Sequence, residues 1–199
     1  PMMLVSTLMN TNPMMIYFGQ ELGEKGMDSE GFSGEDGRTT IFDYWTVDTI
    51  RRWRNNGKFD NKQLTADELS LQDYYAKVLN ICNSSEAVRQ GEFYDLMYVN
   101  PQLQRQYAFV RHTENETLLI VANFAAHDAE VSIHVPQHLF EYYQIEESTS
   151  NDWMDLLTGD SVKASFTSAD ATKLNVPAWG GCVLRMKEQK KTKCKKSKA

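Results

Sequence analysis

The sequence predicts an α+β protein in which the end of a parallel-stranded α/β unit is followed by an antiparallel β-sandwich. Residues Met14–Phe18 are apolar at every position, which is the pattern of a strand covered on both faces. After Gly91 the apolar residues instead recur with a period of two in short segments bounded by turns, as in a sandwich. Because no second strand with a crossover helix follows Met14–Phe18, we expect the chain to be the C-terminal piece of a larger α/β protein.

Three helices are expected before the sandwich. Met2–Met9 is expected to be the end of a helix and Val47–Arg54 a short helix. Thr65 and Glu68 match a capping box, in which the Thr hydroxyl and the Glu carboxylate each accept a hydrogen bond from the other residue's amide. A helix is therefore predicted to start there, with one apolar stripe that packs on a neighbouring wall. The stripe consists of Leu71, Tyr74, Tyr75, Val78, Leu79 and Cys82.

Seven segments after Gly91 have the length and alternation of strands. Thr113–Glu116 is predicted to be a hairpin connection between two of them. The predicted strands are Phe93–Val99, Tyr107–His112, Thr117–Phe124, Glu130–Val135, Trp153–Leu157, Val162–Phe166 and Gly181–Met186.

Charge and hydropathy exclude two classes of partner. The formal net charge is −6, but residues 187–199 hold seven Lys and one Glu, so the rest of the chain carries −12. An acidic body argues against nucleic acid as a partner, and the Lys-rich tail is expected to be disordered. No apolar run approaches the roughly 20 residues that span a bilayer, so no membrane partner is expected. The sequence does not indicate a cellular compartment.

No metal or cofactor is expected in this chain. The three cysteines are far apart, without the spacing of a zinc site or a disulfide framework. The four histidines also lack the spacing of a metal site on a helix, so we interpret them as solvated surface residues. These residues are Cys82, Cys182, Cys194, His112, His127, His134 and His138.

Four stretches in order resemble the α-amylase family, glycoside hydrolase family 13. Residues 13–23, PMMIYFGQELG, resemble the eighth barrel strand and the loop that follows it, and residues 37–45, GRTTIFDYW, resemble a later part of that loop. Residues 69–93 are similar to the last barrel helix and its exit. Residues 176–184, VPAWGGCVL, resemble the closing strand of the family's antiparallel C-terminal domain.

The resemblance implies three parts. Residues 1–91 would be the C-terminal remnant of a catalytic (β/α)8 TIM barrel, residues 92–187 an antiparallel β-sandwich domain, and residues 188–199 a disordered tail. The missing N-terminal barrel of the parent protein would then be the chain's partner. The resemblance leaves a calcium ion possible in that parent.

The resemblance also implies a reaction. Family members cleave or transfer α-glucosidic bonds with retention, using two carboxylates about 5 to 5.5 Å apart. The motifs that carry the nucleophile, the acid/base and the third essential Asp do not occur in this sequence, so the chain has no catalytic residue and is expected to be inactive alone. Starch, maltooligosaccharides, α-1,6-branched glucans and sucrose-like sugars all stay open as substrates, as does hydrolysis versus transglycosylation.

Four residues are candidates for substrate binding. In relatives an acidic residue and an Arg in the long loop contact the sugar beyond the cleavage site, which implies this role for Asp36 and Arg38; a salt bridge within the loop is the alternative. Glu21 follows the expected strand at the barrel mouth, where a structural role is the alternative. Trp45 could stack on a sugar or wedge under the loop.

Two other classes of function stay open. The sandwich could be a stand-alone carbohydrate-binding module, with Trp153 and Trp179 as a glucan-binding surface. It could also be a purely structural domain, with both tryptophans as core aromatics. A pull-down on insoluble starch distinguishes these two readings.

Overall fold

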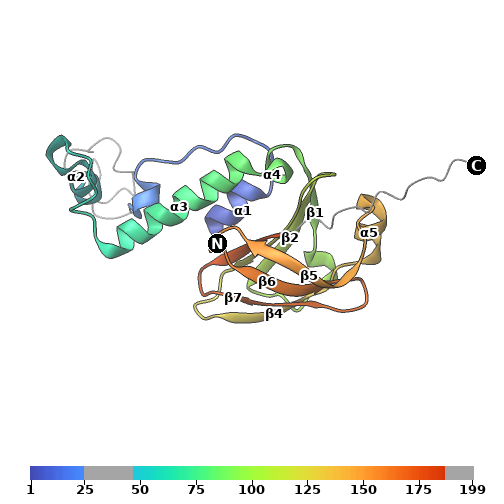
Figure 1. Ribbon diagram of the computed structural model, residues 1–199. Helices are drawn as coiled ribbons and strands as arrows, with labels where there is room; N and C mark the ends of the chain where they lie inside the picture. The colour runs from blue at the N-terminus through green and yellow to red at the C-terminus, as the bar shows by residue number, and fades with distance from the viewer. Residues whose placement is uncertain (25–46, 187–199) are drawn as a thin grey trace, which may run out of the picture. The chain divides into compact units, whose positions relative to one another are not determined.

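The structure is a computed structural model that describes residues 1–24 and 47–186. It divides into two compact units (Figure 1). One unit combines Pro1–Thr11 with Ile81–Ala199, and the other is Asn12–Asn80. The candidates Asp36, Arg38 and Trp45 and the Lys-rich tail lie outside the described residues.

The three helices predicted before the sandwich are confirmed. They are α1 (Met2–Leu8), α2 (Asp48–Arg54) and α3 (Ala66–Ser84), and α3 is followed by the short α4 (Glu86–Gln90). Single turns of 3-10 helix occur at η1 (Gln20–Leu22), η3 (Asn55–Gly57) and η4 (Met97–Val99). No helix of the described part of the chain has the length and apolar content to cross a membrane.

The capping box at the start of α3 is confirmed. The Glu68 amide donates to Thr65 Oγ1 at 3.2 Å, and the Thr65 amide donates to Glu68 Oε2 at 2.8 Å. The Arg52 guanidinium from α2 also donates to the Glu68 carboxylate. Glu68 therefore both caps the start of α3 and links α3 to α2.

The strand expected over Met14–Phe18 is not formed. The segment has no regular secondary structure, and Met14, Met15 and Tyr17 are 38%, 79% and 42% exposed. A strand needs hydrogen bonds to a neighbouring strand, and none of the described strands pairs with this segment. The prediction of a buried strand is therefore wrong for this chain, and the end of a barrel stays a prediction.

The β-sandwich is confirmed as two antiparallel sheets (Figure 1). The larger sheet has the order β1-β2-β3-β8-β5-β6, and β4 pairs with β7 in the smaller sheet. The predicted Thr113–Glu116 connection closes the β2–β3 hairpin, with the Thr113 amide donating to the Glu116 carbonyl at 2.9 Å. The strands are β1 (Glu92–Asp95), β2 (Gln106–His112), β3 (Thr117–Asn123), β4 (Ala129–Ile133), β5 (Ser148–Asp155), β6 (Ser161–Phe166), β7 (Thr172–Val176) and β8 (Gly181–Met186).

The sandwich core lies between the two sheets and is closed at one side by α5 (Gln137–Tyr143), which the sequence did not predict. Trp153 is fully buried there and makes an edge-on contact with Phe166 at 5.2 Å between ring centroids. Trp179 is 60% exposed, so the core reading is confirmed for Trp153 and wrong for Trp179.

The central strand β3 is buried along its whole length. One face meets the sandwich core, and α1 packs near the other face beside β8. A Cβ at Gly181 would lie 2.3 Å from Leu4 Cδ1, so only glycine admits α1 at this distance. The N-terminal helix therefore belongs to the sandwich unit, although the 69 residues of Asn12–Asn80 separate it from the rest of that unit along the chain.

Candidate functional site

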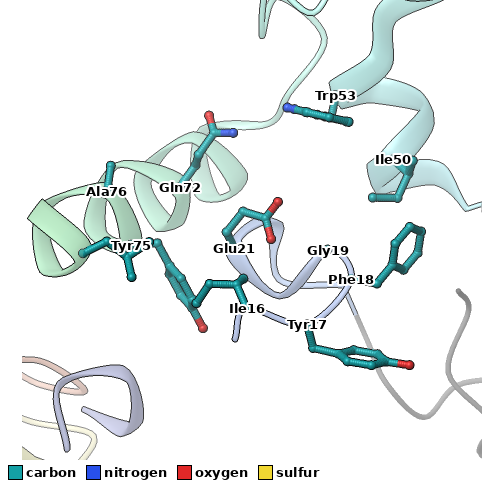
Figure 2. A pocket seen from close by; sticks show the side chains of 11 residues that line it. Ile16, Tyr17, Phe18, Gly19, Glu21, Ile50, Trp53, Gln72, Tyr75 and Ala76 are labelled. Carbon is teal, nitrogen blue, oxygen red and sulfur yellow. The ribbon is translucent and has the colours of Figure 1, made fainter. Parts of the chain in front are cut away.

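A pocket of about 520 Å³ lies within the unit Asn12–Asn80 (Figure 2). Its walls come from the irregular segment before η1, from η1 itself, from α2 and from α3. The lining is mostly aromatic and aliphatic, as in most sites for small ligands. The lining residues are Ile16, Tyr17, Phe18, Gly19, Glu21, Ile50, Trp53, Gln72, Tyr75, Ala76 and Leu79.

Two glycines bracket the turn that carries Glu21. Gly19 and Gly23 have φ of +69° and +76°, the left-handed region that glycine adopts without strain. A Cβ at Gly19 would also lie 2.7 Å from Glu24 Cβ. These two glycines of the run GQELG therefore allow the η1 turn to form and set the direction of the Glu21 side chain.

Hydrogen bonds hold the segment before η1 against α3. Gln20 Oε1 accepts from the Tyr17 amide at 3.1 Å, and Gln20 Nε2 donates to the Tyr75 hydroxyl at 3.0 Å. On the same face of α3, Gln72 Oε1 accepts from Asn61 Nδ2 at 2.9 Å. Gln20 therefore links the Tyr17 backbone to the Tyr75 ring, and Gln72 is held by Asn61.

Glu21 is the single carboxylate among the lining residues. It is half-buried, and it has no hydrogen-bond or ion-pair partner among the described residues. Its side chain extends from η1 toward the side of the pocket bounded by Gln72 and Trp53 (Figure 2). One carboxylate and one amide between aromatic rings suit a ligand with hydroxyl groups and apolar ring faces.

The described lining of the pocket offers no pair of carboxylates for general acid and base work. Glycoside hydrolysis with retention needs two such groups close together, and Glu21 has no acidic neighbour in the lining. What the pocket can do is bind and orient a ligand.

Of the four residues predicted to bind substrate, Glu21 lies in the pocket wall. The positions of Asp36, Arg38 and Trp45 relative to it are outside the described residues. Sequence reasoning missed Gln72 and Tyr75 as pocket residues. Their spacing of three on α3 placed them near one face, but only the tertiary structure shows that this face borders a pocket.

The described residues contain no group of three or more His, Cys, Asp or Glu that could hold a metal ion. Cys82 and Cys182 are free thiols, and burial raises the pKa of both. His127, His134 and His138 are exposed as predicted. His112 differs, because it is half-buried and burial lowers its pKa.

Comparison with known proteins gives structural matches only. No model of a known protein family and no curated protein sequence matches this chain. Many solved structures match it in fold. AmyP in complex with maltose matches with a TM-score of 0.58 at 14% identity, over 92% of this chain and 33% of that one. The α-amylase of Geobacillus thermoleovorans, complexed with acarbose, matches with a TM-score of 0.56 at 15% identity, over 94% and 33%.

The third structure is a trehalulose synthase, MutB, with a TM-score of 0.56 at 17% identity, over 92% of this chain and 37% of that one. The chain thus spans about a third of the length of these three structures. Nearly all of it shares their fold, in the C-terminal part of such enzymes.

Proposed function

We propose that this chain is the C-terminal part of a retaining α-glucosidase or α-amylase that acts on α-glucans. In this proposal it supplies part of the substrate cleft and the β-sandwich domain that packs on a TIM barrel. The observation that carries the proposal is the coverage, because 92–94% of this chain matches about a third of the length of AmyP and of the Geobacillus thermoleovorans α-amylase. Fold alone does not fix function, so the pocket supplies the second line of support.

The pocket chemistry agrees with a saccharide ligand. Glu21 and Gln72 offer an acceptor and donors for sugar hydroxyls, between the rings of Phe18 and Trp53 that can cover an apolar sugar face. Two of the matched structures hold maltose and acarbose, which supports an oligosaccharide as the ligand class. Asp36, Arg38 and Trp45 join Glu21 in this proposal as substrate-binding residues of the intact enzyme.

The chain alone is proposed to be inactive, because the catalytic carboxylates would lie in the missing N-terminal barrel. The test compares the purified 199-residue chain with the longer protein that, in this proposal, contains it. We expect reducing-sugar release from starch or maltoheptaose only with the longer protein, and NMR of the first product should show retention at the anomeric carbon. Activity of the short chain above a heat-killed control, or a longer protein inert on every α-glucan, would refute the proposal.

A stand-alone module is the second candidate, and the closed core of the sandwich favours it. The core of this unit is complete without any further chain, with Trp153, Phe166 and Leu184 almost fully buried. A module of this kind could bind glucan or serve only as a structural domain. Retention of the chain on insoluble starch in the absence of any barrel would support the binding module.

A further inference from the structure

Four aromatic rings form a continuous row on the surface of the sandwich unit. Tyr94 lies on β1, Tyr98 lies on η4, and His138 and Tyr142 are one turn apart on α5. Neighbouring ring centroids are 6.4 Å apart for Tyr98 and Tyr94, 6.0 Å for Tyr94 and His138, and 5.9 Å for His138 and Tyr142. Tyr98 and Tyr142, at the two ends, are 62% and 58% exposed. The two ends of the row are therefore open to a ligand, and Tyr94 between them is half-buried.

The row is held from below by buried side chains. Leu139 and Phe140 anchor α5 in the core and leave His138 and Tyr142 on its outer face. The half-buried Tyr143 packs edge-on against Tyr142, with 5.0 Å between the ring centroids. Because the fold fixes these rings in advance, little conformational entropy is lost when a ligand is bound.

Hydrogen bonds link three of the rings into a chain. The Tyr98 and Tyr94 hydroxyls are 2.8 Å apart, and the Tyr94 hydroxyl is 3.0 Å from His138 Nδ1. If Tyr94 donates to His138, then Tyr98 donates to Tyr94; Tyr98 is left as an acceptor and His138 Nε2 carries a proton to donate. If His138 Nδ1 donates to Tyr94 instead, Tyr94 donates to Tyr98, so the Tyr98 hydroxyl keeps a proton to donate and His138 Nε2 is an acceptor. In either state one end of the chain offers a donor and the other an acceptor.

Either end of this hydrogen-bond chain can be the donor while the other is the acceptor. The chain therefore suits a ligand whose groups both donate and accept hydrogen bonds. Sugar hydroxyls have this property, and the C–H face of a pyranose covers an aromatic ring. The Glu92 carboxylate lies close enough to Tyr142 to raise the pKa of its hydroxyl, and so adds a further acceptor beside that ring. A purely apolar peptide would leave the hydroxyls of the row without partners in the interface.

We infer that this row of four rings is a binding site for an oligosaccharide. Pyranose rings stack on Tyr98 and Tyr142, and the Tyr98–Tyr94–His138 chain bonds their hydroxyls. The choice of an α-1,4-glucan as the saccharide rests on the proposed function. The ring row itself does not depend on it.

The test is a calorimetric titration of the full 199-residue chain with maltoheptaose, with cellohexaose as the matched β-linked sugar. We expect saturable binding of maltoheptaose that weakens by about tenfold or more in Tyr142→Ala and Tyr98→Ala, as for the loss of one stacking platform. Tyr94→Phe keeps the ring and breaks the hydrogen-bond chain, so it should weaken binding without changing the melting temperature by more than a few degrees. The control is His134→Ala, which removes an exposed ring of the same unit outside the row and should bind as the wild type does.

Two results would overturn the inference. One is a wild-type chain that binds neither sugar; the other is binding that persists unchanged in the Tyr98→Ala and Tyr142→Ala double variant. Binding through these rings, combined with a longer protein that is inert on α-glucans, would sustain the site and refute the proposed function. An active longer protein whose C-terminal chain binds no sugar would refute the site alone.

Discussion

The Arg111 guanidinium donates a 2.7 Å hydrogen bond from Nη2 to the carbonyl of Gly91, the residue that follows α4. It also donates to the carbonyls of Ala87, Val88 and Met9 at 3.1, 3.0 and 3.2 Å. The side chain is buried and forms no ion pair with a described carboxylate. A buried cation is thus held by the carbonyls at the ends of α1 and α4, which is the favourable place for positive charge at a helix.

Replacement of Arg111 by Met is expected to destabilise the sandwich unit strongly. The change removes the guanidinium donor from four carbonyls, of which Ala87 keeps a second donor in the Gly91 amide, and a buried group left unsatisfied costs about 1–3 kcal/mol. We expect a loss of about 3 kcal/mol or more in the free energy of unfolding, measured by urea denaturation. Arg105→Met on the exposed surface is the control. An equal loss in both variants would mean that the carbonyl contacts contribute nothing specific.

The hydrogen-bond partners of Arg111 could not be predicted from the sequence, whereas the start of α3 could. The start of α3 was predictable because Thr65 and Glu68 are three residues apart and meet through local geometry alone. The partners of Arg111 lie up to 102 residues away, and no spacing in the sequence indicates them. The pocket beside Glu21 was not predictable for the same reason, because its walls come from separate elements.

Three errors in the predicted elements have the same physical origin. Met14–Phe18 has the composition of a buried strand, but strand formation depends on a partner that composition does not reveal. Conversely, α5 has no side-chain cap and only seven residues, and it is helical because Leu139 and Phe140 are buried in the core. The polar start of β5 at Ser148 was missed because backbone pairing with Phe166 in β6, not its side chains, makes it a strand.

Glu68→Gln is expected to weaken α2 and α3 in a pH-dependent manner. The hydrogen bonds from Arg52 lower the pKa of Glu68 below its usual value. Its contribution is therefore fully present above the unfolded pKa of about 4.5 and is lost as the pH falls through the lower folded value. We expect a cost of about 1 kcal/mol at pH 7 from the lost ion pair with Arg52, because Gln can still accept from the Thr65 amide, and this cost shrinks toward pH 2.5. Thermal melts followed by far-UV circular dichroism measure it, with exposed Asp73→Asn as the control.

His112 should make the sandwich unit sensitive to mild acid. Burial lowers its pKa below 6.5, and its ring stacks at 4.3 Å on Tyr143 and shares a 2.9 Å hydrogen bond with Thr117. The unfolded chain thus binds the proton more readily, so stability is full above pH 6.5 and falls as the pH drops toward the folded pKa. His112→Gln should flatten the slope of unfolding free energy between pH 7.5 and 5.5, and exposed His134→Gln should not. Equal slopes in both variants would contradict the prediction.

Arg38→Ala and Glu21→Gln are expected to impair catalysis by the longer protein that we propose. Each removes one charged hydrogen-bond partner of a bound sugar, a loss of about 1.5–3 kcal/mol. Their kcat/KM on maltooligosaccharides should therefore fall about tenfold or more with an unchanged melting temperature. Arg54→Ala, exposed at the end of α2, is the matched control. Wild-type kinetics for both variants on several α-glucans would show that Asp36, Arg38 and Glu21 are only structural.

Met15 should drive self-association of the isolated chain. It is 79% exposed beside the exposed Met14 and Tyr17, in a segment without regular hydrogen-bonded structure. Exposed apolar patches and unpaired extended backbone recruit partners. We expect light scattering to show concentration-dependent oligomers for the wild type that Met15→Lys dissociates, while exposed Met2→Lys on α1 has a smaller effect.

Limited proteolysis supplies the second readout. The segment around Met15 should be cleaved early, and Phe93–Met186 should survive, because a complete core protects its strands. A wild-type chain that is monomeric at every concentration, with residues 12–24 as protected as the sandwich, would show that Met14–Phe18 needs no partner. It would also remove the physical reason for assigning this segment to a missing barrel.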